Sequence, residues 1–523
     1  MLMRLNVKKT TRILVASAVL AVGGSAVGVR EAGAGQAPVA PTPQALPLAM
    51  EQAVAMALEA NLGLKAERLN VDVANQSILL AHATFLPQVQ SSVSRQSSRS
   101  VPSDFTQGTS DITGAGLNVS GTVAQNMKWY GSNYSLTWSG NRSTQDGGLS
   151  SFNPRLNSTL RVNFNQPLLR NFKTDSSRVQ LVTSERNRVI TDLRLQQQVV
   201  ATESQVRLAY LSLVGAIEGK KVADQNMEIA ERSLRESRTR VQVGLSPNIE
   251  IIQSEAQVAS NREQVIVATA QIATAEDNLR SLILEPSRPD YWTVQLIPTD
   301  QIMLQRRDVD VDQVIKNALA NRLDLAVQKR SLEITNINLD LGRNQTLPNV
   351  DFNLTYASQG TAGTQFQYGS GFPPPIIDRI GRSYGSALGD TFGGAYPSWG
   401  IGVTVAYPIG KTREQVSLAQ GEIQKRQQEL GLQDLELQIV REVRDAARQV
   451  ENSYQRVQAT EAFRQAAQQQ LEAEERRFAV GISTTLDLQV RQTQLATARV
   501  SELNARISYN RALIVLDRVQ KTQ

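Results

Sequence analysis

The side chains that most often perform catalysis or bind metals are nearly missing from this sequence. Among its 523 residues there is no cysteine and a single histidine, His82. Thiolate catalysis, structural disulfides and cysteine-based metal sites are therefore excluded. His82 lies at the end of a helical pattern, just before Leu86-Pro87, where a lone histidine is most often a polar surface residue. We expect no enzymatic activity, no metal and no cofactor.

The most distinctive short motif occurs twice, as a glycine turn between two long stretches with helical periodicity. The two copies read Val243-Gly244-Leu245-Ser246, with Glu250 shortly after, and Val480-Gly481-Ile482-Ser483, with Asp487 shortly after. Glycine ends a helix readily because it adopts the left-handed conformation, and a following serine can cap the next helix. Two such turns predict a duplicated chain in which each turn joins two helices.

The N-terminus has the pattern of a secretory signal peptide, predicted at residues 1–34. Basic residues precede an apolar run at 13–22, and small residues follow it, with cleavage expected after Ala26 or Ala34. The apolar run is too short for a permanent membrane anchor. Removing residues 1–34 takes away five basic residues and one acid, so the formal net charge falls from +6 to +2. We therefore expect no nucleic-acid partner.

After a Pro-rich linker at 35–47, the chain divides into two repeats, 48–289 and 309–523, joined by a connector at 290–308. Residues 57–64 recur 261 positions later at 318–325, and Gly244 recurs 237 positions later as Gly481. Composition supports long helices, with 41% apolar but only 5% aromatic residues. Helices are predicted at 48–84, 174–243, 247–284, 309–346, 411–480 and 484–519.

Strands with one apolar and one polar face are predicted within 87–166, at 349–357 and at 398–407. The Gly- and Pro-rich stretch 358–397 has no apolar periodicity and is expected to be a loop. Alternating strands in a secreted chain are typical of an outer-membrane β-barrel. A soluble β-sandwich would also alternate, but helices of about 100 Å have nothing to pack on in a sandwich. One chain has too few strands to close a barrel, so several chains must pool their strands.

This order of elements, present twice, resembles the TolC-type outer-membrane efflux protein family over nearly the whole mature chain. The resemblance implies an α+β membrane protein: a trimeric β-barrel in the outer membrane, continued by a long periplasmic coiled-coil barrel of α-helices. It also implies a homotrimer that serves as an exit duct for efflux or secretion. Its expected partners are outer-membrane lipid, a periplasmic adaptor (membrane fusion protein) and an inner-membrane pump. A periplasmic adaptor or coiled-coil scaffold is the alternative, since it would also contain long helical hairpins.

By the same resemblance, the two turns match the family's adaptor-contact motif. The expected docking residues are Gly244, Leu245, Ser246, Gly481, Ile482 and Ser483. The alternative is ordinary helix-turn chemistry, and both can hold at once. Asp487 matches a position that lines the family's closed periplasmic entrance, and Glu250 is its counterpart in the first repeat. Each could equally be a carboxylate that stabilises a helix N-terminus.

The sequence departs from the family at the position of its closing latch. Phe478 and Ser483 stand where some members have a tyrosine and an arginine, and Val490 replaces a second constriction aspartate. The closed entrance is therefore expected to be held differently, with Arg477 or Arg240 reaching an acidic neighbour.

The first repeat also has an extra strand pair, predicted at 117–125 and 132–140. The connection between these strands, 126–131, is short, whereas the flanking stretches 96–115 and 141–155 are long. Short turns belong on the periplasmic side of such barrels and long loops outside. The sequence therefore predicts six membrane strands per chain and eighteen in a trimer, against the family's usual twelve. The alternative is an extracellular hairpin above a twelve-stranded barrel.

Overall fold

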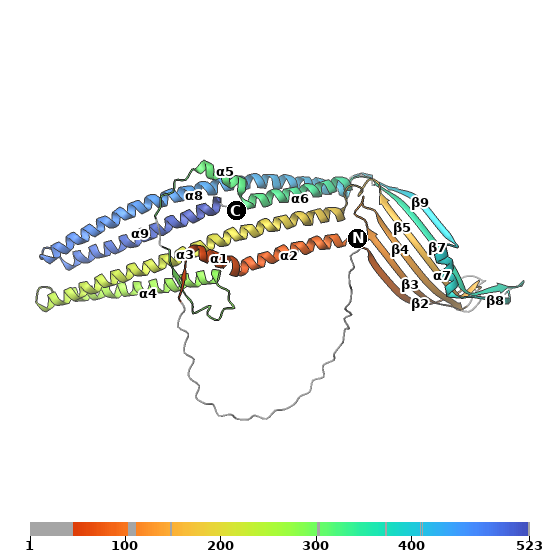
Figure 1. Ribbon diagram of the computed structural model, residues 1–523, viewed down its shortest axis with the longest axis horizontal. Helices are drawn as coiled ribbons and strands as arrows, with labels where there is room; N and C mark the ends of the chain where they lie inside the picture. The colour runs from red at the N-terminus through yellow and green to blue at the C-terminus, as the bar shows by residue number, and fades with distance from the viewer. Residues whose placement is uncertain are drawn as a thin grey trace, which may run out of the picture. The chain divides into compact units, whose positions relative to one another are not determined.

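The structure is a computed structural model that describes residues 45–102, 111–146, 149–300, 304–371, 374–407, 409–410 and 412–520. The expected signal peptide and residues 35–44 of the expected linker lie outside the described residues. The last linker residues belong to a short strand, β1 (Ala45–Leu48), which pairs in parallel with β6 (Gln295–Pro298). Long helices and one large sheet make up most of the described chain (Figure 1).

The first repeat contains four helices and, after β1, four long strands. In chain order they are α1 (Met50–Ala60), α2 (Leu62–Ala83), β2 (Gln88–Ser100), β3 (Ile112–Asn126), β4 (Asn133–Asp146), β5 (Phe152–Pro167), α3 (Ser176–Gln242) and α4 (Ile249–Ile283). The second repeat contains α5 (Val311–Asn321), α6 (Leu323–Gln345), β7 (Asn349–Tyr368), β8 (Ile376–Arg382), α7 (Tyr384–Gly393), β9 (Pro397–Ala406), α8 (Arg413–Ala479) and α9 (Thr485–Gln520).

Each repeat opens with a broken helix, where we had expected single helices at 48–84 and 309–346. The breaks fall at Asn61 and Arg322, which are 261 positions apart and have nearly the same extended backbone angles, φ −60°, ψ 121° and φ −62°, ψ 128°. The Asn61 side chain accepts a hydrogen bond from the Leu64 N–H at 3.0 Å and so caps α2. The two repeats therefore agree even in the positions where their helices begin and end.

The helices form a curved layer in which α2, α3, α6 and α8 are successive neighbours. Farther from the sheet, the α3–α4 and α8–α9 hairpins continue side by side through α3 and α9 (Figure 1). Each repeat has its own large apolar core: the first joins α1, α3 and α4 and contains Tyr210, and the second joins α5, α6, α8 and α9 and contains Tyr509. Each buried hydroxyl donates to a backbone carbonyl, Tyr210 to Leu48 at 2.9 Å and Tyr509 to Gln305 at 2.6 Å. The two tyrosines thereby tie the connecting segments to the helices.

The six expected strands form one antiparallel sheet in the order β2-β3-β4-β5-β7-β9. They are longer than expected: the strand predicted at 349–357 continues to Tyr368, and β2 and β3 extend into the predicted loop at 96–115. The prediction of a loop at 358–397 was wrong, because that stretch contains the end of β7, β8 and the short helix α7. Its small and glycine-rich sequence hides the periodicity that a strand or helix normally shows.

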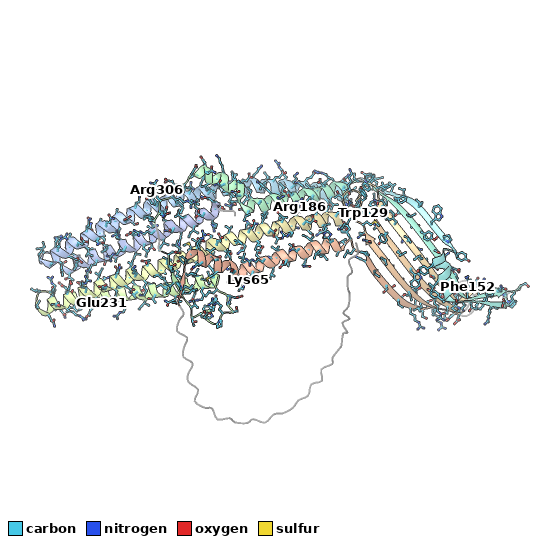
Figure 2. The ribbon with its side chains drawn as sticks, viewed as in Figure 1. Lys65, Trp129, Phe152, Arg186, Glu231 and Arg306 are labelled. Atoms are coloured by element: carbon cyan, nitrogen blue, oxygen red, sulfur yellow. The ribbon has the colours of Figure 1, made fainter. Side chains whose placement is uncertain are left out.

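The β3–β4 hairpin is the extra pair of the first repeat, inserted between β2 and β5. Its turn lies beside the end of α2, where Lys128 Nζ is 3.2 Å from His82 Nδ1 and Gln125 donates to the Phe85 carbonyl at 2.9 Å. Figure 2 shows Trp129 at this junction with the helices, whereas Phe152 lies at the opposite end of the sheet. The prediction that this turn lies on the helical side of the sheet is confirmed.

The sheet has one apolar and one polar face. Directly paired residues share a face, and one such row is Val123, Leu136, Val162, Tyr356 and Trp399. The neighbouring row on the other face begins Thr122, Thr137 and Arg161, and the two threonine hydroxyls are 3.1 Å apart. Among the described helices, none is long and apolar enough to cross a membrane.

Ile439 tests how strongly the second apolar core stabilises the long helices. It is fully buried in α8, so Ile439→Ala leaves a cavity and should lower the free energy of unfolding by about 2–4 kcal/mol. Denaturant unfolding in detergent, followed by the helical circular dichroism signal, measures the change. Gln433→Ala, at an exposed position on the same helix, is the control and should stay within about 0.5 kcal/mol of the parent. Equal losses in both variants would contradict the assigned core.

Candidate functional site

The two glycine turns have the same backbone geometry. Gly244 and Gly481 are left-handed, with φ +78° and +79°. In each turn the residue after the glycine donates back into the helix, Leu245 to the Arg240 carbonyl at 2.8 Å and Ile482 to the Arg477 carbonyl at 3.0 Å. This six-residue closure is the Schellman motif, which satisfies helix carbonyls and requires the positive φ. A β-carbon on either glycine would meet no described atom within 4 Å, so conformation and not space selects glycine.

Both turns present an apolar side chain at the end of the helices farthest from the sheet (Figure 1). Leu245 is 71% exposed and Ile482 is 65% exposed. The sequence prediction thus names two residues that have no intramolecular reason to be apolar.

The polar groups of the second turn are bound to one another. Asp487 and Thr484 form a capping box at the start of α9: the Thr484 hydroxyl accepts from the Asp487 N–H at 3.2 Å, and Asp487 Oδ2 accepts from the Thr484 N–H at 3.4 Å and from the Thr484 hydroxyl at 2.7 Å. These hydrogen bonds with Thr484 hold the pKa of Asp487 below its usual value. Asp487 therefore has the capping role considered in the sequence, and it remains a fully exposed negative charge. Ser483 donates to Glu474 on the last turn of α8.

Glu250 is placed differently from Asp487. Its Oε2 accepts a hydrogen bond from the Thr485 hydroxyl at 2.6 Å, which joins the start of α4 to the start of α9. A second link follows one turn on, where Gln489 donates to the Ser254 hydroxyl at 3.3 Å. Glu250 thus ties the two hairpins of the chain together. Comparison of the two repeats did not predict this contact, because the residue 237 positions before Thr485 is an asparagine and the repeat gives no sign of a hydroxyl at this place.

Arg240 makes a further contact between the hairpins. Its guanidinium carbon lies 4.2 Å from the centre of the Phe478 ring, within the range of a cation–π interaction. The sequence led us to expect that Arg477 or Arg240 reaches an acidic neighbour, and Arg240 instead lies against the aromatic ring of Phe478. Arg477 does reach an acid, Glu474 at 3.5 Å, although on its own helix. Arg240 and Phe478 line a groove of about 660 Å³ between α3 and α8.

The outer edges of the helical layer carry apolar stripes that sequence reasoning missed. On α8, four exposed residues follow one another at intervals of seven: Val416, Ile423, Leu430 and Leu437. On α2, at the other edge, the exposed residues are Leu62, Leu69, Val73 and Leu80. Such spacing is that of coiled-coil seams. The sheet has matching edges, since within the described chain neither β2 nor β9 has a second strand neighbour.

Comparison with known proteins shows where this arrangement recurs. The model of the family described as outer membrane efflux protein matches residues 132–283 and 314–519, more than half of the chain. The first matched range begins at the end of the β3–β4 turn, so α1, α2, β2 and β3 lie outside it. No curated protein matches the sequence significantly.

Several solved structures have the same fold at low sequence identity. The Campylobacter jejuni CmeC outer membrane channel is 15% identical with a TM-score of 0.63, and 90% of this chain matches 85% of it. The outer membrane protein VceC of Vibrio cholerae is 14% identical with a TM-score of 0.63, covering 90% of this chain and 95% of VceC. CusC is 15% identical with a TM-score of 0.64, covering 91% and 92%.

These matches assign the fold and the cellular site. Family members of this kind are channels of the outer membrane and are not enzymes, so the protein acts in transport across that membrane. A periplasmic adaptor or scaffold, the alternative considered from the sequence, does not fit this assignment. The chain belongs to the outer membrane efflux protein family.

Proposed function

We propose that three copies of this chain form a continuous exit duct, with a β-barrel in the outer membrane and a helical conduit in the periplasm. The observation that carries the proposal is the presence of open edges on both layers of one chain. One edge consists of β2 and α2, and the other of β9 and α8. Because these edges differ, each would contact the opposite edge of the next copy, which closes a ring.

The sheet edges demand such closure. In lipid, unpaired backbone N–H and C=O groups cost several kcal/mol each, so only a closed sheet can span the bilayer. Three chains pairing β2 with β9 of the next copy give eighteen strands, since β3 and β4 lie within the sheet path. β8 pairs only with the far half of β7, beyond the reach of β9, and adds no strand to the ring. Barrels of 16–18 strands leave an aqueous channel.

The helical edges support the same arrangement. The seven-residue stripe on α8 and the stripe on α2 would bury each other between neighbouring copies, as in a coiled coil. This seam follows directly from the β2–β9 contact, because α2 leads into β2 and β9 leads into α8. A single rotation that relates neighbouring copies would therefore pair the open strand edges and also bury the apolar stripes of the helices.

The turns at the free end of the helices are the proposed docking surface for a periplasmic adaptor that leads to an inner-membrane pump. Leu245 and Ile482 supply exposed apolar contacts on rigid backbones. The residues that follow the two turns differ, since Pro247 follows the first and Thr484, which caps α9, follows the second. Three copies would present two alternating kinds of contact around the mouth. The duct itself is passive, and the pump selects the substrate.

The same end forms the proposed entrance constriction. Three copies of Asp487 and of Glu250 around one opening would favour cations. The contacts between the hairpins of each chain, Arg240 with Phe478 and Glu250 with Thr485, would hold this opening in a narrow state. They would take the place of the latch of those family members that carry a tyrosine and an arginine at the positions of Phe478 and Ser483.

Cysteine pairs test the proposed β2–β9 junction, since the chain has no cysteine of its own. Val93→Cys on β2 is combined in turn with a cysteine at Trp399, Ile401 or Val403 on β9, all on the apolar face. Oxidation of outer-membrane fractions should give covalent trimers for at least one pair. The control pairs Ile401→Cys with Leu136→Cys on the interior strand β4, which should stay uncrosslinked. Heat-modifiable migration of the parent trimer is expected, and a monomeric product from every edge pair would contradict the ring.

Asp487→Asn distinguishes the two roles of this residue, because it removes the negative charge but keeps a side chain that can cap α9. The amide oxygen can still accept from Thr484, so the fold should keep its stability while the channel loses part of its cation preference. Ion selectivity in planar bilayers measures the effect, and the more severe Asp487→Ala removes both roles. Glu451→Gln, an exposed carboxylate on α8 about 45 Å from the turn, is the control. Unchanged selectivity and conductance in both Asp487 variants would exclude the charged entrance.

Phe478→Leu tests the contact between the hairpins. The aliphatic side chain keeps the bulk but removes the cation–π interaction, which is worth about 0.5–2 kcal/mol. The ratio of open to closed entrances should therefore rise by about twofold to thirtyfold per chain, seen as longer open times in single-channel recordings. Phe463→Leu, on the same helix but away from Arg240, should leave gating unchanged. Equal gating in the parent and both variants would rule out this contact as a restraint.

A further inference from the structure

The short helix α7 lies on the apolar face of the sheet, at the end away from the helices (Figure 1). A β-carbon on Gly360 of β7 would lie only 2.1 Å from the Ala387 carbonyl oxygen, so α7 lies directly over this position. Gly360 shares its face with Tyr356 and Leu354, because the register of β7 is unbroken between them. The helix therefore cannot be a plug on the polar face, which would line the lumen of the proposed barrel.

The strands provide a floor of small residues for this helix. Ser158, Ser358, Gly360 and Ala362 are all buried on this face, whereas Ala357, Gln359 and Thr361, on the other face of β7, are not. The Thr391 hydroxyl donates to the Ser158 carbonyl at 3.0 Å, and the Tyr384 hydroxyl occupies the space above Gly140. Larger side chains at these positions would displace the helix. The site is thus built to hold α7 against the sheet.

The surface that α7 turns away from the sheet is apolar. Phe392 is 65% exposed, and Leu388 lies one turn before it on the same side. The helix has a single charged residue, Asp390, and it is paired with Arg382 of β8 at 2.9 Å. Tyr396 and Trp399, immediately after the helix, are also exposed on the way into β9. Intramolecular contacts explain the inner face of α7, but nothing in the described chain covers its outer face.

The position of α7 along the strands indicates what covers it. On β7 the exposed apolar residues end at Tyr356, and the floor of α7 begins two residues later at Ser358. From Val350 to Tyr356 the strand rises about 20 Å, which at a tilt of about 40° spans only about 15 Å of membrane. The apolar band of such barrels is about 25 Å tall. The outward face of α7 continues the apolar surface where that of β7 stops.

Arginine marks the limit of this surface. Arg142 lies on the same face of β4, two residues beyond Gly140, and Arg95 lies on the same face of β2. Both are exposed, and long basic side chains at such levels reach lipid headgroups. Arg382, the partner of Asp390, adds a basic group beside α7 itself. The helix therefore lies between the apolar band and a basic rim.

We propose that α7 is an interfacial helix whose Phe392 face lies in the outer leaflet of the outer membrane, at the boundary of acyl chains and headgroups. The proposal rests on the placement of the barrel proposed above and extends it to a stretch that is not a strand. Aromatic and aliphatic side chains at this depth contribute to anchoring, because their apolar parts leave water while the nearby arginines remain hydrated. The helix would fix the height of the barrel in the membrane on the side of β5 and β7.

Single nitroxide labels test this placement, and the natural absence of cysteine keeps each label unique. Phe392→Cys reports on α7, and Gly389→Cys, exposed on the same side, repeats the measurement if the first variant folds poorly. Leu354→Cys on the apolar face and Thr355→Cys on the polar face are adjacent controls on one strand. Collisions with oxygen and with an aqueous nickel chelate are compared in vesicles that contain lipopolysaccharide.

The expected ratio of oxygen to nickel collisions is above one at positions 392, 389 and 354, and below one at 355. A ratio below one at 392 and 389, with 354 above one, would show α7 in water and overturn the inference while leaving the barrel in place. Protection of 392 and 389 from both reagents would show a protein neighbour, which also overturns it. A ratio below one at 354 would instead contradict the membrane placement of the sheet, and with it the proposed function.

Discussion

The constraint on which the rest of the structure depends is the hydrogen bonding of two strand edges. β2 and β9 each have one strand neighbour within the described chain, and a sheet with open edges cannot lie in hydrocarbon. α2 and α8 continue directly from the same two strands, so in the proposed ring the pairing of strands between chains would also set which helices meet. Apolar stripes lie on these two helices, at the edges of the layer.

The duplication explains why one chain has two unlike edges. β2 corresponds to β7 and β5 to β9, since the helices before and after them repeat at offsets of 261 and 237 residues. The first offset is larger by 24 residues, which reflects the β3–β4 hairpin. The second repeat has β8 and α7 between the corresponding strands instead. One repeat thus widens the sheet, while the other adds a helix to its surface.

The sequence could predict the elements that have strong periodicity. The two helices of 67 residues, the six alternating strands and the side of the sheet on which the predicted turn 126–131 lies all follow from spacing and turn length. It could not predict α7, because Gly385, Gly389 and Gly393 make a poor helix that forms only against the small-residue floor of β5 and β7. Nor could it predict the Glu250–Thr485 and Arg240–Phe478 contacts, which join residues more than 200 positions apart.

The two glycine turns have the same backbone but different side-chain contacts. The backbone of both turns is the same, with glycine at φ +78° and +79°. The carboxylates that follow the turns differ in their partners. Asp487 forms hydrogen bonds at the start of its own helix, whereas Glu250 accepts a hydrogen bond from a threonine of the other hairpin. Glu250 is therefore coupled to the separation of the hairpins and Asp487 is not. A movement that parts the hairpins would break the Glu250–Thr485 and Arg240–Phe478 contacts together, so these two contacts couple the two hairpins at this end of the chain.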